Sequence, residues 1–191
     1  MSNIPIIFVI FNALITSDIA FGEESGLRDL TVEELQNYEF DLEEAPATVK
    51  ELSLGQQYSL DSQRRAMMDL IARRLGILTL KGDSSDLRVL QKMIDRGIVR
   101  KQDVRGLQGL GILFGDLLAN KYGLTWVSYE DDIGLSKALR WKKTENYVFP
   151  VSLFSKRAHF KEEIKMGIVF EDLSADIEAF IAYEKARPVF K

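Results

Sequence analysis

The sequence contains no cysteine and a single histidine among its 191 residues. Without cysteine the chain can form no disulfide, and it can support neither thiol catalysis nor a thiolate metal site. The one histidine, His159, stands in a charged stretch, and a zinc site built on it would need further histidines or a carboxylate cluster at fixed spacing. We therefore expect His159 to be an ordinary exposed or hydrogen-bonding residue, and we expect no bound metal and no cofactor.

Motifs that commonly identify a reaction are missing as well. There is no HExxH, no GxxxxGK, and no GxSxG to supply the nucleophile of a triad that would have to use His159. Gly106, Gly109 and Gly111 lack the GxGxxG spacing and follow no expected strand, so they are not a dinucleotide-binding fingerprint. The acidic run at residues 130–132 lacks the spacing of a calcium loop, and we expect a solvated hairpin turn there. No catalytic residue can be assigned.

The charge of the chain is mildly negative. It has 29 acidic and 25 basic residues, a formal net charge of −4. Such a protein does not concentrate phosphate backbones around itself, so we expect no nucleic-acid partner. Its length and its 46% hydrophobic content are sufficient for one globular unit with a sizeable core.

The first 22 residues differ from the rest of the chain. Residues 4–15, IPIIFVIFNALI, carry no charge; this suits the apolar part of a secretory signal and is short of the roughly 20 residues that cross a bilayer. Ala20 and Gly22 put small residues at positions −3 and −1 of a cut before Glu23. The apolar run is preceded by no Lys or Arg, and a buried N-terminal element or an uncleaved anchor are the alternatives. We expect a signal peptide over residues 1–22, a periplasmic or secreted protein, and no transmembrane span after cleavage.

The remaining chain divides at about residue 102. Residues 23–102 show the helical spacing of apolar side chains, and we predict a helical region there. In residues 103–191, segments at 124–130, 137–142 and 147–151 are rich in strand-forming residues and are joined by short turns, which predicts a three-stranded antiparallel meander. We predict an α+β fold in which N-terminal helices pack beside a helix, this meander and C-terminal helices.

Several helix signals occur in the N-terminal region. Thr31 and Glu34 fit a capping box, whereas residues 40–54 have the composition of a loop or linker. Asp61 is positioned to cap a second helix, which Gly76 would end. The arginines along this helix predict a solvated face, with a surface for an anionic partner as the alternative: Arg64, Arg65, Arg73 and Arg74.

A helix predicted over residues 103–121, which Gly123 would end, organises the second part. Gly111 and Gly115, with Ala119, recur every four residues and therefore share one stripe of it. Glycine in a helix costs about 1 kcal/mol relative to alanine. Two glycines in one stripe indicate that another element approaches closely, with flexibility as the alternative. Pro150 is expected to end the third strand and begin a helical turn.

Candidate ligand-binding residues lie on the strands and on the helix that follows them. Arg140, Trp141, Lys156 and Arg157 could line one pocket, with Trp126 at its wall, if the sheet and that helix pack together. Arginine beside tryptophan can bind an anion or stack on the ring. The alternative is that Arg140 pairs with the acidic turn across the hairpin.

Several short pieces occur in a fixed order between about residues 106 and 172. They are Leu110-Gly111, Phe114-Gly115, Gly123-Leu124 with Trp126, Ala138-Leu139-Arg140, Phe149-Pro150 and Ser155-Lys156-Arg157. Their order and spacing resemble the bacterial domain-of-unknown-function family 3806. The resemblance implies a small α+β domain and no established activity, so it provides no catalytic residues.

These features together favour a binding or interaction protein of the bacterial envelope, without catalytic activity and with another envelope protein as its partner. One version is an immunity-type inhibitor, an acidic protein that neutralises a basic enzyme acting on the envelope. The alternative is a binder of a small molecule or anion, or a hydrolase, that uses Arg140, Lys156 and Arg157.

Overall fold

The structure, a computed structural model, describes residues 47–187 and confirms the α+β class, with five α-helices and a four-stranded antiparallel sheet in this range. The signal segment and the capping box at Thr31 lie outside the described residues. The elements are β1 (Thr48–Glu51), α2 (Leu54–Leu75), the short 3₁₀ helix η1 (Ser84–Asp86), α3 (Leu87–Asp95), α4 (Val104–Tyr122), β2 (Leu124–Asp131), β3 (Gly134–Trp141), β4 (Tyr147–Val148), α5 (Pro150–His159) and α6 (Met166–Ala186).

The central helix α4 has the ends that the sequence predicts. The Asp103 carboxylate accepts a hydrogen bond from a first-turn N–H at 2.8 Å, and Gly123 takes the left-handed φ of 67° that ends the helix. Phe114, fully buried at the middle of α4, meets the rings of Phe154 and Phe170 edge-on, with centroids 5.1 and 5.7 Å away. These ring contacts join α4, α5 and α6 in one core.

Helix α2 begins earlier than predicted. Ser53 is its cap: the Ser53 Oγ accepts from the N–H of Gln56 at 3.3 Å, and the Gln56 side chain accepts from the N–H of Ser53 at 2.8 Å. This capping box satisfies two N–H groups that the helix leaves unpaired. Asp61, predicted as the cap, therefore lies inside the helix. Gly76 ends α2 as predicted, with a φ of 70°.

The sheet has one strand more than the predicted meander. β2, β3 and β4 form the predicted antiparallel meander, and β1 adds to the free edge of β2, which gives the order β1-β2-β3-β4. The prediction of a loop or linker over residues 40–54 is wrong for β1. So short a strand is stabilised mainly by pairing with a distant strand, and its own sequence pattern does not reveal that partner. β4 is shorter than predicted, because Pro150 already begins α5.

The two faces of the sheet contribute to different apolar clusters. One face packs toward α4 and joins the main core through Leu124, Leu139, Trp141 and Val148. The other face carries a second cluster that contains Val127, Tyr129 and Ala138. Side chains on successive residues of a strand point to opposite faces, so neighbours in the sequence belong to different clusters.

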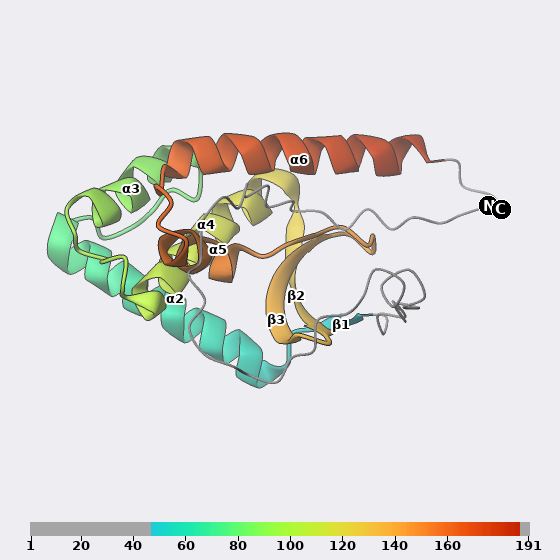
Figure 1. Cartoon of the computed structure of the whole chain (residues 1–191), viewed down its shortest axis with the longest axis horizontal. Coiled ribbons are helices and arrows are strands. Elements are labelled where there is room, and N and C mark those ends of the chain that lie inside the picture. Colours follow the sequence, from blue (N-terminus) through green and yellow to red (C-terminus); the bar gives the residue numbers. More distant parts are fainter. Residues whose placement is uncertain (1–46, 188–191) are drawn as a thin grey trace, which may run out of the picture.

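The helices form the other layer of the molecule. Figure 1 shows α2 and α6 as the outer helices, with α4 and α5 between them and the sheet beside α4. α2 reaches α4 through Met67, whose methyl group lies over Gly109. None of the helices between residues 47 and 187 combines the length and the apolar content that crossing a membrane requires.

Candidate functional site

Gly111 and Gly115 lie where α4 comes closest to α5 and β2. A Cβ atom at position 111 would stand 2.2 Å from the carbonyl oxygen of Pro150. At position 115 it would stand 2.7 Å from the Trp126 ring and 2.9 Å from the Pro150 ring. All three distances are shorter than atoms can approach without a shift of one of them. The glycine stripe thus lets the start of α5 and the indole of Trp126 pack directly on the backbone of α4.

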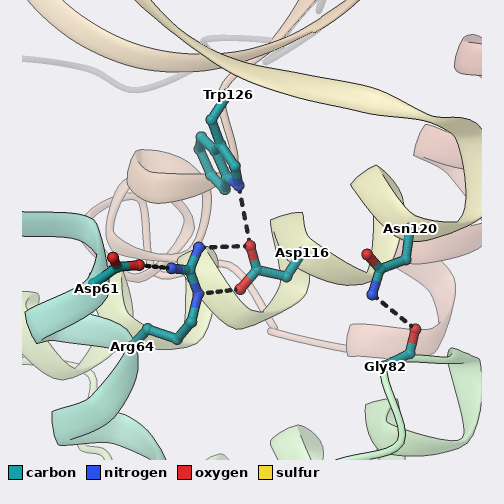
Figure 2. Close-up of polar contacts among 6 residues, drawn as sticks. All are labelled: Asp61, Arg64, Gly82, Asp116, Asn120 and Trp126. Carbon is teal, nitrogen blue, oxygen red and sulfur yellow. Dashed lines mark hydrogen bonds and ion pairs between the residues drawn. The ribbon is translucent and has the colours of Figure 1, made fainter. Parts of the chain in front are cut away.

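A polar network beside this contact joins α2, α4 and β2 (Figure 2). The guanidinium of Arg64 donates to both carboxylate oxygens of Asp116, from Nε at 2.6 Å and from an Nη at 2.8 Å. Its other Nη donates to Asp61, one turn earlier on α2. The indole N–H of Trp126 donates to Asp116 at 3.0 Å. Asp116 is therefore the acceptor that helix and strand share.

The ion pair of the network favours the charged form of Arg64. The side chains of Arg64 and Asp116 are 29% and 24% exposed, so the two-pronged ion pair is only partly screened by water. The hydrogen bond to Asp116 raises the pKa of Arg64, and this effect outweighs the opposing effect of burial. The network consequently favours the charged form of the guanidinium.

A second contact joins the same part of the chain to α4, one turn further on. Asn120 donates to the carbonyl oxygen of Gly82 at 3.2 Å, as Figure 2 shows. Gly82, with a φ of 78°, also donates its N–H to the buried carboxylate of Asp86 at 2.7 Å. Both α2 and the connection after it are therefore held on one side of α4 by polar side chains four residues apart.

This arrangement is suited to positioning rather than to proton transfer. Both oxygens of Asp116 already accept hydrogen bonds, and one of them accepts two. These bonds occupy three of the roughly four acceptor sites of the carboxylate, whereas a general base must present a free site to a substrate proton. The network of Arg64, Asp116 and Trp126 acts instead as a clamp, which sets the position of α2 against the domain.

The candidate cation Arg140 is engaged elsewhere. Its Nε donates to the carbonyl oxygen of Thr144 at 2.6 Å, an Nη donates to Glu145 at 2.9 Å, and its guanidinium lies 5.5 Å from the ring of Tyr147. Arg140 therefore pairs with the turn that follows β3, and not with the acidic turn at residues 130–132 that precedes β3. The hydroxyl of Tyr147 donates to Glu145 at 2.8 Å. Burial is the larger cause and this hydrogen bond the smaller one, and together they raise the pKa of Tyr147 well above its ordinary value.

The remaining candidate ligand residues occupy separate places. Arg157 on α5 donates to Glu162 at 3.0 Å, while Lys156 is exposed. Trp141 is 8% exposed in the main core, with the ammonium of Lys142 at 4.4 Å from its ring. By the strand register, Trp126 and Trp141 share one face of the sheet and Arg140 the other. The structure therefore does not bring these side chains together in one pocket.

The acidic turn and the histidine have local roles. One carboxylate oxygen of Asp131 accepts from the N–H groups of Ile133 and Gly134, at 3.1 and 3.0 Å, and so shapes the hairpin turn. His159 is exposed at the end of α5, with its ring against that of Phe160. Between residues 47 and 187, no three His, Asp or Glu side chains come together in a way that would hold a metal ion.

The sequence reasoning missed the partnership of Arg64 with Asp116. One signal for it existed: Asp116 is the only charged residue between Leu107 and Ala119, in a helix segment otherwise composed almost wholly of apolar residues and glycine. A carboxylate in such surroundings requires a partner. Periodicity alone could not identify that partner, because it lies on another helix.

Comparisons with known proteins agree with this fold. Residues 86–170 match the family described as "Domain of unknown function (DUF3806)". No curated protein matches the sequence. A crystal structure at 1.50 Å from Bacteroides thetaiotaomicron VPI-5482 is similar, with a TM-score of 0.61 and 17% sequence identity over 69% of this chain and 48% of that one. The chain thus spans about half the length of that protein, and the likeness shows the fold alone.

Proposed function

With residues 86–170 identified as a DUF3806 domain, we propose that this protein is an exported interaction protein of the bacterial envelope that binds another protein and catalyses no reaction. The family description assigns no activity, so the surface and the site residues are what support this function. The partner class we propose is an envelope protein, and an acidic, immunity-type inhibitor of a basic enzyme is the version that the net charge of −4 favours.

The tip of the β2–β3 hairpin carries this proposal. Ile133 is 92% exposed and Leu135 is 62% exposed. The two amides bound by Asp131 fix the turn, so these apolar side chains are held in water rather than folded back. Two exposed apolar side chains, two residues apart on a fixed turn, are suited to contact with a protein partner.

The placement of the cations favours this class over the alternative. A small-molecule or anion binder, or a hydrolase, that used Arg140, Lys156 and Arg157 would need them around one cavity. Two of them are instead paired with nearby carboxylates, Glu145 and Glu162, and they lie on separate elements. Their positive charge is thereby largely neutralised within the chain.

A capture experiment tests the proposal. The tagged protein is incubated with bacterial envelope extract, and the proteins retained by the natural chain are compared with those retained by the variant Ile133→Ser/Leu135→Ser. We expect the variant to lose a partner that Leu78→Ser retains, because Leu78 is 80% exposed but lies on a different segment, after α2. Equal retention by all three chains would exclude the hairpin tip as the binding surface.

Export is tested separately by cell fractionation. The uncharged residues 4–15 and the small residues Ala20 and Gly22 support a cleaved signal. We expect the periplasmic or secreted fraction to hold a chain that begins at Glu23. Recovery of the chain from the cytoplasm with Met1 retained would contradict export without affecting the hairpin result.

A further inference from the structure

Three arginines line one cleft near the ends of α2 and α3. Figure 1 shows these two helix ends on its left. Arg74 comes from the last turn of α2, Arg96 follows α3, and Arg100 lies in the connection to α4. Gly97, Ile98 and Asp103 complete the lining, and the cleft has a volume of about 450 Å³. None of these residues contributes to the clamp or to the hairpin tip.

Some arginines in the described part of the chain have a carboxylate partner and others have none. Arg64, Arg73, Arg140, Arg157 and Arg187 each have a carboxylate within 4.0 Å. Within residues 47–187, no carboxylate comes so near to the remaining six arginines. Three of them lie outside the cleft (Arg65, Arg88 and Arg105), and the other three, Arg74, Arg96 and Arg100, are exposed and line it. Like charges gathered around one cleft repel one another, and an anion between them would relieve that repulsion.

The backbone that carries two of these arginines is well fixed. Gly97 takes a φ of 63°, which reverses the chain, and its N–H bonds to the carbonyl oxygen of Ile94 at 2.9 Å. The N–H of Val99 bonds to Met93 at 2.9 Å, and Val99 is buried. The backbone of this part of the cleft is thus held by its own hydrogen bonds, which lowers the entropic cost of binding a ligand.

The chemistry of the lining selects a type of ligand. The N–H groups of a guanidinium match the spacing of phosphate oxygens, so one guanidinium can donate two parallel hydrogen bonds to one phosphate. Asp103 also lines the cleft; one of its carboxylate oxygens caps α4, and the other can accept from a ligand hydroxyl. The volume falls in the range of small-molecule sites. We propose that the cleft binds a phosphate group attached to a small hydroxylated moiety, of which glycerol phosphate is the simplest example.

Local charge supports the assignment. The segment from residue 73 to residue 105 contains nine Lys or Arg and four Asp, with no Glu, in a chain whose net charge is −4. Positive charge is therefore concentrated in the segment of the chain that supplies the lining of the cleft. A competing explanation is that Arg74 and Arg96 merely offset the partial negative charges at the ends of α2 and α3. Arg100, outside both helices, is not explained in that way.

The test is a titration of the full-length protein with glycerol 3-phosphate up to about 10 mM, followed by amide chemical shifts. We expect saturable shifts confined to residues 96–103 and to the end of α2. The variant Arg96→Gln/Arg100→Gln should weaken binding by about tenfold or more. Arg65→Gln/Arg88→Gln removes the same charge outside the cleft and should leave binding unchanged within about twofold. Thermal unfolding of each variant confirms that it is folded.

A second arm distinguishes a free ligand from a lipid head group. Vesicles of phosphatidylglycerol in phosphatidylcholine are sedimented with each chain. Suppose that the vesicles retain the natural chain, that only Arg96→Gln/Arg100→Gln abolishes this retention, and that free glycerol 3-phosphate causes no shifts. This result would assign the cleft to the lipid head group. Shifts without retention would assign it to a free ligand. Absence of both, or equal weakening by the two double variants, would overturn the site and leave the hairpin proposal unaffected.

Discussion

The carbonyl oxygen of Pro150 determines which residue can occupy position 111. Because it would lie 2.2 Å from a Cβ atom there, the contact is with backbone that cannot rotate away. The Trp126 ring at position 115 is a side chain, but it is held by its bond to Asp116. The glycine spacing predicts that something approaches α4 closely. It does not predict what approaches, because Pro150 follows the whole hairpin in the sequence.

We expect Gly111→Ala to lower the free energy of unfolding by about 1–3 kcal/mol or more, through overpacking against the start of α5. The matched control is Gly167→Ala in α6, where nothing lies within 4 Å of the added methyl group. That change should be neutral or stabilising by about 0.4–1 kcal/mol, since alanine loses less conformational freedom in a helix. Urea unfolding measures both. Equal effects of the two changes would mean that helix propensity, not the Pro150 contact, governs position 111.

Tyr147 should make the fold sensitive to alkaline pH. Its pKa in the folded state is raised above the ordinary value of about 10 by burial and by Glu145. Below about pH 10 the folded and unfolded states both keep the phenolic proton, so the phenol does not change the free energy of unfolding. As the pH rises past about 10, the unfolded state ionises first, and the free energy of unfolding falls until the pH passes the pKa of the folded state.

Unfolding followed between pH 8 and pH 12 tests this, with Tyr147→Phe as the variant that cannot ionise. We expect its free energy of unfolding to decline less steeply above about pH 10 than that of the natural chain. Tyr183→Phe, at a 60% exposed position, should follow the natural chain. Parallel curves for the natural chain and Tyr147→Phe would show that the phenol ionises alike in both states.

At the scale of elements, local sequence signals account for α4 much better than for α2 and β1. Asp103 begins α4 and Gly123 ends it, as predicted, because each residue acts on backbone groups within one turn of itself. Ser53 and Gln56 form an equally local capping box, but the loop-like composition of residues 40–54 obscured it. β1 depends on β2, more than seventy residues later, and no local pattern contains that information.

The clamp between α2 and α4 is likewise non-local, and its strength can be measured. A double-mutant cycle with Arg64→Met and Asp116→Asn should give a coupling energy of about 1–2 kcal/mol, because the pair is two-pronged and partly buried. The exposed pair Arg73–Asp69, at 3.9 Å, serves as the comparison and should give less than about 0.5 kcal/mol. A coupling no larger than that of the exposed pair would show that α2 is held by apolar packing alone.

At the scale of the whole molecule, the family match and the physical unit have different limits. The match begins at Asp86 and ends at Phe170, so it omits α2 and most of α6. Both helices contribute to the main core, α2 through Met67 and Ile71, and α6 through Leu173 and Ile177. The described range is therefore held together by residues on both sides of the matched segment.

A fragment limited to residues 86–170 should consequently lose its cooperative thermal transition and bind the dye ANS, because the core faces of α3, α4 and α5 would be exposed to water. A fragment of residues 47–187 should unfold in one transition near that of the full chain. Calorimetry and dye fluorescence make the comparison. A sharp transition of the shorter fragment at the same temperature would show that α2 and the end of α6 are dispensable.

The clamp also gives the molecule a natural optical reporter. Of the two tryptophans in the chain, Trp141 lies in the core of the sheet, while Trp126 lies at the junction of α2, α4 and β2 with its indole N–H on the carboxylate that Arg64 holds. Emission from the first follows the integrity of the core. Emission from Trp126 reports the packing of α2, which lies outside the matched family segment, against α4. Replacing either ring with phenylalanine therefore separates two structural events in unlabelled protein.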